Sequence, residues 1–292
     1  MNTCKGRAYH FKSAILKGVV AFGIAVMTIS ALAGSAAAES LLERIKNGET
    51  IRLGFSNDPP GSYPGENNEP LGFANAITAG ILKKMGAAKI ESVVTDWGSL
   101  VPGLQAGRFD IITAGMWIKP ERCRNVLFSE PIGVGQGAMI VPKGNPQGLH
   151  SFQDVLTRGL TLVTGTGYAD VKNAQKLGIA DDKIMQVAGP PEIVQALKAG
   201  RAAVGVLGDN ITANIFAQKD PTIEVVDPYI PPGPNEHPAI AFSINEQAAV
   251  DAFNAVLKGY IGSEEMMTSV SKYGYGKRDL PDGKKTADLC NG

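Results

Sequence analysis

Short apolar segments alternate with helical patterns along most of the chain, and this alternation limits the folds that the sequence can adopt. Strands that alternate with helices build βαβ units and parallel sheets. We therefore expect an α/β protein whose sheets are mostly parallel and flanked by helices. The predicted strands are residues 51–55, 90–94, 109–113, 160–164, 184–187, 203–207, 223–226 and 239–243. The predicted helices span about 73–85, 99–106, 168–177, 191–199 and 250–261.

One segment of the chain resembles another. Residues 100–111 are similar to residues 193–204, because in both a helical pattern ends at Ala-Gly-Arg and leads directly into an apolar strand. The similarity is too short to indicate a repeat protein. It favours two lobes of similar topology over coincidence, and we expect the corresponding strand ends, 115–117 and 208–210, to face each other.

Two passages rich in proline and glycine suggest where the chain crosses between these lobes. We expect hinges near 140–143 and 230–240. Lobe 1 would then be formed by residues 39–140 and 235–292, and lobe 2 by residues 143–232. Two crossings permit a hinge motion that opens and closes a cleft.

The N-terminus has the pattern of a secretory signal peptide. Four basic residues precede an apolar run at 18–34, which ends in a small-residue A-x-A site. We expect cleavage after Ala38, which would place residues 1–38 in the leader and the mature chain in the periplasm. A membrane anchor is the alternative, but the apolar run is short and a cleavable site follows it at once.

Charge and cysteine content narrow the partners and the chemistry. The leader carries four of the 28 basic residues and none of the 28 acidic ones, so the mature chain has a net charge of −4. Nucleic acid and anionic membranes need a basic patch, and we expect neither as a partner. Cys123 and Cys290 form an even pair in an oxidising compartment, which predicts a disulfide. No metal-ligand spacing is present, and we expect no metal and no cofactor.

Gly115, Trp117 and Arg122 follow the apolar strand at 109–113. In open α/β sheets, small ligands bind at the carboxyl ends of the strands. A guanidinium binds a carboxylate through two parallel hydrogen bonds. The group therefore suits a ligand with both a cation and a carboxylate; a half-buried tryptophan and a surface arginine are the alternative.

Two aspartates and two aromatic residues follow other predicted strands. Asp58 comes after the strand at 51–55, and Asp209, with Asn210 beside it, comes after the strand at 203–207. Carboxylates at these positions can meet a ligand cation, although they also serve as turn or cap residues. Trp97 and Tyr63 can face the same opening, where an aromatic face attracts a cation by up to about 2 kcal/mol.

A Gly-Thr-Gly turn at 165–167 lies between a predicted strand and a predicted helix. Backbone N–H groups at a helix start bind anions, so Thr166 and Gly167 could complete a carboxylate clamp opposite Arg122. The alternative is an ordinary strand-to-helix turn. We expect no catalytic residue, because no Ser or Cys nucleophile has an evident base beside it. His237 lies in a proline-rich crossing and His150 in a polar loop.

Several short motifs of the mature chain carry a resemblance to a known family. They are Leu71-Gly-Phe73, Leu104-Gln-Ala-Gly-Arg-Phe-Asp110, Lys119-Pro-Glu-Arg-Cys123, Phe128-Ser-Glu-Pro131, Gly165-Thr166 and Asp209. With these motifs the mature chain resembles the family 3 extracellular solute-binding proteins, the receptors of polar amino-acid ABC importers. The resemblance implies the two-lobed periplasmic binding protein fold of type II, with two hinge crossings. It also implies that Arg122 and the amides of Thr166 and Gly167 hold a ligand carboxylate, and that Asp209 lies where amino-acid receptors hold the α-amino group.

Within that family the sequence is most similar to the receptors for ectoine and hydroxyectoine. Trp97 and Trp117 fall on two of the three aromatic positions that surround the cationic ring in those receptors. The third position falls near Gly61, where this chain has no aromatic residue, and Tyr63 could substitute. The chain also departs from the family at Ala74, where an aspartate is usual.

These features predict a monomeric periplasmic receptor that captures a small zwitterion, ectoine or hydroxyectoine, and delivers it to an ABC permease. A receptor for an ordinary polar or basic amino acid is the alternative within the same family. The alternative from another class is an enzyme on the same scaffold, such as a periplasmic dehydratase. Only Asp58, Glu130 and Asp209 are candidates for its general acid.

Overall fold

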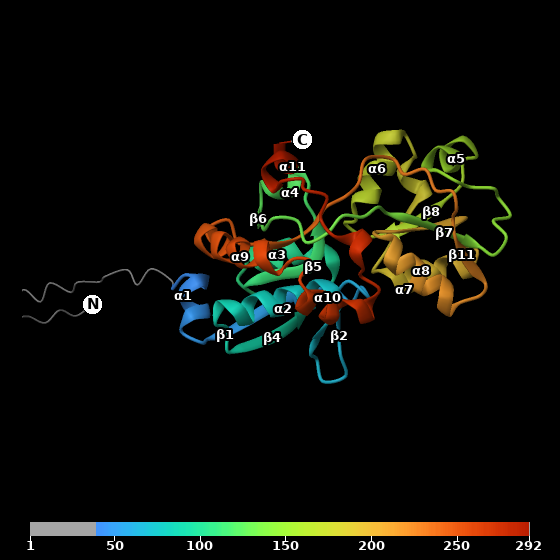
Figure 1. Cartoon of the computed structure of the whole chain (residues 1–292). Coiled ribbons are helices and arrows are strands. Elements are labelled where there is room, and N and C mark those ends of the chain that lie inside the picture. The colour runs from blue at the N-terminus through green and yellow to red at the C-terminus, as the bar shows by residue number, and fades with distance from the viewer. Residues whose placement is uncertain (1–38, 292) are drawn as a thin grey trace, which may run out of the picture. The chain divides into compact units, whose positions relative to one another are not determined.

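The computed structural model describes residues 39–291, so the predicted signal peptide lies outside the described residues. Two five-stranded sheets and a short two-stranded hairpin organise the chain. We call the sheet that contains β5, with the helices that pack on it, lobe 1, and the sheet that contains β10, with its helices, lobe 2 (Figure 1). Between residues 39 and 291, every helix is too short or too polar to cross a membrane.

Lobe 1 has the strand order β4-β1-β5-β12-β6. The strands β4, β1 and β5 are mutually parallel, and β12 pairs antiparallel with both β5 and β6. The strands are β1 (Thr50–Phe55), β4 (Lys89–Val94), β5 (Ile111–Trp117), β6 (Leu127–Phe128) and β12 (Pro238–Phe242), and the hairpin is β2 (Tyr63–Pro64) and β3 (Pro70–Leu71). The helices are α1 (Leu41–Lys46), α2 (Phe73–Met85), η1 (Trp97–Ser99), α3 (Leu100–Gln105), α4 (Pro120–Cys123), α9 (Gln247–Tyr260), α10 (Glu264–Val270), η3 (Ser271–Tyr273), η4 (Lys277–Asp279) and α11 (Thr286–Asn291).

Lobe 2 has the strand order β11-β7-β10-β8-β9. Here β10, β8 and β9 are mutually parallel, and β7 pairs antiparallel with both β10 and β11. The strands are β7 (Ala138–Pro142), β8 (Leu162–Gly165), β9 (Ile184–Val187), β10 (Val204–Leu207) and β11 (Ile223–Val225). The helices are α5 (Phe152–Thr157), α6 (Ala169–Leu177), η2 (Asp181–Lys183), α7 (Pro190–Lys198) and α8 (Asn210–Lys219).

The two lobes repeat one path of the chain, as the sequence predicted. The path β1-α2-β4-α3-β5 in lobe 1 corresponds to β8-α6-β9-α7-β10 in lobe 2, and the strand orders match when one is read backwards. The similar segments at 100–111 and 193–204 are the α3–β5 and α7–β10 units. In each sheet four of the five strands run in one direction, which confirms the mostly parallel α/β fold.

The Ala-Gly-Arg sequences end α3 and α7 with the same turn. Gly107 has φ +66° and Gly200 has φ +67°, a left-handed conformation that glycine adopts without steric cost. The amide of the following arginine, Arg108 or Arg201, donates to a carbonyl near the end of the helix at 2.9 or 3.0 Å. The turn therefore directs both helices straight into a buried strand.

The chain changes lobes twice, and the first change lies earlier than the sequence suggested. We expected a hinge near 140–143, but these residues belong to β7, where Ile140 pairs with Gly205. The chain therefore leaves the lobe 1 sheet after β6 and enters the lobe 2 sheet at Ala138. It returns between β11 and β12, in residues 226–237, so residues 238–240 of the expected crossing belong to β12. The apolar residues of β7 continue up to Pro142, and they form a strand of the lobe 2 sheet instead of a hinge.

Helices cover both faces of the lobe 2 sheet. Successive β7 side chains point to opposite faces, as a strand requires: Ile140 packs with α7 residues such as Ile193, whereas Met139 packs with α5 residues such as Phe152. In Figure 1, α5 and α6 lie on one side of β7 and β8, and α7 and α8 lie on the other. The lobe 2 sheet is therefore buried on both faces, which explains its continuous apolar strands.

The cysteine pair lies in lobe 1. Cys123 ends α4 and Cys290 lies in α11. Their sulfur atoms are 2.06 Å apart and their Cα atoms 5.8 Å apart, so the structure pairs the two residues that the sequence predicted. This pairing ties the C-terminal helix to the segment that carries Arg122.

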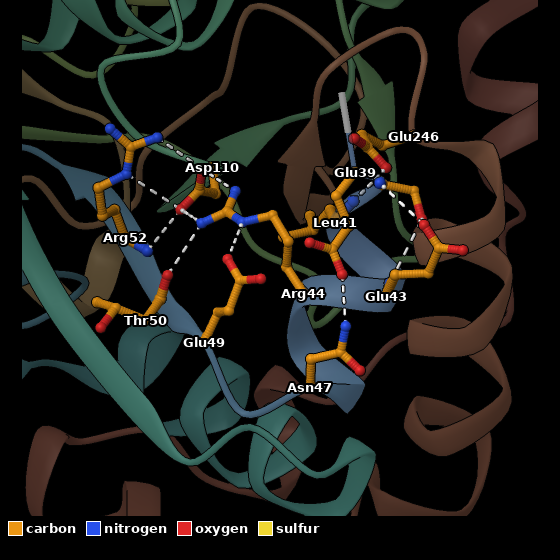
Figure 2. Close-up of polar contacts among 11 residues, drawn as sticks. Glu39, Leu41, Glu43, Arg44, Asn47, Glu49, Thr50, Arg52, Asp110 and Glu246 are labelled. Carbon is orange, nitrogen blue, oxygen red and sulfur yellow. Dashed lines mark hydrogen bonds and ion pairs between the residues drawn. The ribbon is translucent and has the colours of Figure 1, made fainter. Parts of the chain in front are cut away.

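Asp110 joins three elements at the start of β5, shown in Figure 2. Its carboxylate, which is only 6% exposed, accepts from Arg44 of α1 at 2.8 Å and from Arg52 of β1 at 2.7 Å. Burial alone would raise the pKa of Asp110, but the hydrogen bonds from Arg52 and Arg44 outweigh it and lower the pKa. This network fixes the amino end of β5, about 20 Å of strand away from its carboxyl end.

We expect Asp110→Asn to lower the free energy of unfolding by about 1–3 kcal/mol, because both arginines lose a charged partner. Chemical denaturation measures the change. The control is Glu265→Gln, which removes an exposed ion pair with Lys84 and should cost less than about 1 kcal/mol. Equal losses in the two variants would contradict the role of Asp110.

Candidate functional site

A cavity lies where the carboxyl ends of β5 and β10 approach each other. Gly115 and Trp117 line it from lobe 1, and Gly208, Asp209 and Asn210 line it from lobe 2. Its empty space, counted out to the open mouth, is about 770 Å³. The two strand ends that the sequence comparison paired therefore bound one cavity.

Arg122 lines the lobe 1 side of this cavity from the one-turn helix α4. Its guanidinium donates to the carbonyl of Trp117 at 2.9 Å and to the carbonyl of Gly167 at 3.3 Å, and it lies 5.8 Å from the ring of Trp97. Burial lowers the pKa of Arg122, although an arginine stays charged at any physiological pH. Across residues 39–291, no carboxylate lies within ion-pair distance of Arg122, so its charge is not neutralised by the chain.

The turn at Gly165–Gly167 contacts Arg122 through a carbonyl, whereas we predicted that its amides face a ligand opposite Arg122. The amide and the hydroxyl of Thr166 both donate to the carbonyl of Val187, at 2.8 and 3.2 Å, because this contact continues the β8–β9 pairing. Gly167 has φ +79° and presents its carbonyl, which accepts from Trp97 and Arg122, each at 3.3 Å. Neither Thr166 nor Gly167 lines the cavity in this structure, and a carboxylate clamp from their amides stays a prediction.

Aromatic side chains form two groups in the cavity wall. Trp97 meets Tyr168 edge to face, with ring centroids 5.2 Å apart, and Phe73 lies 5.4 Å from Tyr275. Trp117 is the fifth aromatic residue that lines the cavity. Aromatic faces attract cations most strongly where water is excluded.

Tyr63 is not part of this wall. It lies in the hairpin strand β2 and packs edge-on against Tyr273, 6.2 Å away, outside the cavity. A side chain at Gly61 would lie 3.8 Å from the ring of Phe73. The aromatic group that we expected from Tyr63 is therefore supplied by Phe73, which starts α2, and by Tyr275 from the C-terminal segment.

Two predicted aspartates also line the cavity, Asp58 from lobe 1 and Asp209 from lobe 2. Tyr168 donates to Asp58 at 2.7 Å, and Asp209 begins α8 by accepting from the amide and the hydroxyl of Thr212, both at 2.7 Å. Burial, with the charge of Asp209 added, raises the pKa of Asp58 to about 7. Burial also raises the pKa of Asp209. A ligand cation would relieve this concentration of negative charge.

Asp170 is a further acidic residue of the cavity that the sequence did not single out. It is the second residue of α6 and is only 2% exposed. Burial, with the charge of Glu236 added, raises its pKa to about 7. Its position one turn past the Gly-Thr-Gly sequence was the available signal, since helix starts next to strand ends commonly border ligand sites.

The cavity therefore combines one cation, several carboxylates and five aromatic faces. Arg122 is the only basic residue among those that line it, while Asp58, Asp170, Asp209 and Asp279 are acidic. Such a site fits a small molecule with a carboxylate at one end and a cation elsewhere. Among the residues that the structure describes, no three His, Cys, Asp or Glu side chains are grouped to hold a metal ion.

Asp58 and Asp170 predict how the stability of the unliganded protein depends on pH. The pKa of each is about 7 in the folded protein, against about 4 in an unfolded chain. Between these values the folded protein binds more protons than the unfolded chain, so the free energy of unfolding falls as pH rises. We expect a higher melting temperature near pH 5 than near pH 8, and a smaller difference in Asp58→Asn and in Asp170→Asn.

Thermal unfolding of the unliganded protein across this pH range measures the effect. Asp182→Asn changes an exposed carboxylate of lobe 2 and should leave the pH dependence as it is. If melting temperatures rise from pH 5 to pH 8, or if the two cavity variants behave as Asp182→Asn does, the assigned pKa values are wrong.

Comparison with known protein families gives a match over most of the chain. Residues 51–276 match the family described as "Bacterial extracellular solute-binding proteins, family 3". A relative from Sinorhizobium fredii, "Probable amino-acid ABC transporter periplasmic-binding protein y4tE", is 33% identical over 93% of this chain and 92% of its own length.

A solved structure and an enzyme are also similar to the chain. The crystal structure of EhuB in complex with hydroxyectoine has a TM-score of 0.78 and 30% identity, and the match covers 86% of this chain and 97% of that one. The cyclohexadienyl dehydratase of Pseudomonas aeruginosa is 26% identical over 71% of this chain and 77% of its own length.

Proposed function

The chain belongs to the family 3 bacterial extracellular solute-binding proteins, and we propose that it is the periplasmic receptor for ectoine or hydroxyectoine of an ABC importer. A solute of this kind is a small zwitterion with a carboxylate and a cationic ring. The likeness to EhuB in complex with hydroxyectoine supports this choice. Export through a cleaved leader at 1–38 and a disulfide between Cys123 and Cys290 belong to the same proposal.

Arg122 is the residue on which the proposal depends. Its two hydrogen bonds go to carbonyl oxygens, which position the guanidinium without cancelling its charge. The charge is therefore available to a carboxylate, and guanidinium–carboxylate hydrogen bonds are about twice as strong as neutral ones. The faces of Trp97 and Trp117, with Asp58 and Asp209, would surround the cationic end.

We further propose that lobe 1 comprises residues 39–137 and 236–291, and that lobe 2 comprises residues 138–230. Three hydrogen bonds already join the lobes beside the cavity: Tyr168 to Asp58, and both Trp97 and Arg122 to Gly167. A solute held by groups of both lobes would favour the closed arrangement by its higher affinity for it. The closed receptor would then be the form that the permease recognises.

A thermal-shift and calorimetry panel tests the solute. It contains ectoine, hydroxyectoine, arginine, lysine and glycine betaine. We expect ectoine or hydroxyectoine at a hundred times its dissociation constant to stabilise the protein by about 2.7 kcal/mol. Tryptophan fluorescence should change as well, because both tryptophans of the chain line the cavity. Failure of both ectoines to bind would refute the proposal.

We expect Arg122→Ala to weaken solute binding at least about 100-fold, because the carboxylate loses its charged, two-point partner. Arg122→Lys should restore only part of the affinity, since an ammonium lacks the planar fork. Isothermal calorimetry measures both variants. Arg124→Ala, which removes an exposed arginine two residues away, is the matched control, and an equal loss there would argue against a specific role for Arg122.

The excess of carboxylates in the cavity favours a second candidate, a receptor for a basic amino acid. A ligand with two positive groups would balance more of the charge of Asp58, Asp170, Asp209 and Asp279. In the panel, this candidate predicts binding of arginine or lysine in preference to the ectoines.

The dehydratase alternative predicts chemistry rather than binding. Asp58 and Asp170, whose pKa burial raises to about 7, are cavity residues suited to act as a general acid. We propose that the chain binds without reaction, as a transport receptor does. Formation of product from a cyclohexadienyl substrate would show otherwise.

A further inference from the structure

Asp170 is buried in the cavity wall without a partner. Its side chain is only 2% exposed, and its Oδ2 atom has no hydrogen-bond partner among the residues of the structure. Burying a carboxylate without a partner costs free energy, and buried polar groups in proteins are nearly always bonded. The hydroxyl of Tyr229, which borders a smaller cavity together with Asp170, also has no partner, so Oδ2 is open to a donor from Tyr229 or from a bound solute.

The charged neighbours of Asp170 are already engaged. Lys119 pairs with Glu236 at 2.6 Å, and the guanidinium of Arg122 donates to two carbonyls. Neither forms an ion pair with Asp170 within residues 39–291. Glu236 instead adds negative charge nearby, and together with burial it raises the pKa of Asp170. A hydrogen-bond donor placed here would lower the free energy of the ionised carboxylate.

The position of Asp170 makes it accessible to a bound solute. Asp170 and Trp117 line the main cavity and also a smaller one, whose other residues include Tyr229. A side chain at Gly137 would lie 3.6 Å from Oδ1 of Asp170 and 3.7 Å from the ring of Trp117. The absence of a side chain at Gly137 leaves room beside both groups.

Asp170 belongs to the end of the cavity where Arg122 lies. Both residues line the cavity, and Trp117, whose carbonyl accepts a hydrogen bond from Arg122, lies beside Gly137 as Asp170 does. Suppose that a zwitterion binds Arg122 through its carboxylate and holds its cation near Asp58 and Asp209. The solute atoms next to its own carboxylate would then lie beside Asp170. These atoms are therefore the ones that Asp170 can select.

We propose that Asp170 accepts a hydrogen bond from a hydroxyl or amino group of the solute that lies close to its carboxylate, and that it thereby selects solutes with such a donor. This inference rests on the proposed function, since it assumes a zwitterion bound to Arg122. It identifies Asp170 as a specificity-determining residue. In an ectoine receptor, the donor would be the hydroxyl group of hydroxyectoine.

Matched pairs of solutes, with and without the donor, test the inference by calorimetry. The pairs are hydroxyectoine and ectoine, 3-hydroxyproline and proline, and arginine and its analogue without the α-amino group. In whichever pair binds, we expect the member with the donor to bind about ten-fold or more tightly. Asp170→Ala should abolish this preference, and Asp170→Asn should retain part of it because an amide oxygen still accepts.

The outcomes separate this inference from the proposed function. The inference is supported if the preference for the solute with the donor disappears in Asp170→Ala but persists in Asp182→Asn. Thermal unfolding checks that both variants are folded. Binding of a pair without preference, or a preference that survives in Asp170→Ala, overturns it and leaves the receptor function intact. Binding of no solute from any pair overturns both.

Discussion

One guanidinium and four carboxyl groups line the same cavity, and this imbalance of charge dominates the site. Arg122 is positioned by carbonyl oxygens of Trp117 and Gly167, which accept hydrogen bonds without carrying net charge. Burial raises the pKa of both Asp58 and Asp170 to about 7, and the charges of Asp209 and Glu236 add to the rise. A solute with both signs of charge completes this arrangement, because each of its ends meets an unpaired group.

The topology explains why this cavity lies beside the crossings of the chain. Each sheet has one antiparallel strand that directly follows a crossing: β7 follows the first crossing and β12 follows the second. Gly135 and Pro238, which flank these strands, line the cavity directly. Movement at the crossings would therefore change the cavity itself, as a receptor that closes on its solute requires.

Sequence patterns predicted the fold better than the details of the site. The predicted strands correspond to observed ones, and the central strands β5, β8, β10 and β12 are continuous apolar runs because they are buried on both faces of a sheet. The helix α8 was not predicted, since its apolar residues do not form a clear stripe. Five residues that the sequence singled out line one cavity: Arg122, Trp97, Trp117, Asp58 and Asp209. They follow strands at carboxyl ends, where the fold brings residues together.

The sequence alone determined which segments form strands, where the lobes repeat one another, and which charged and aromatic residues follow the strand ends. These properties depend on local periodicity and on the order of elements. Only the tertiary structure decided that Gly167 presents its carbonyl, that Phe73 and Tyr275 replace Tyr63, and that Asp170 is buried without a partner. Such features depend on peptide orientation and on contacts between residues distant in sequence, which local patterns do not encode.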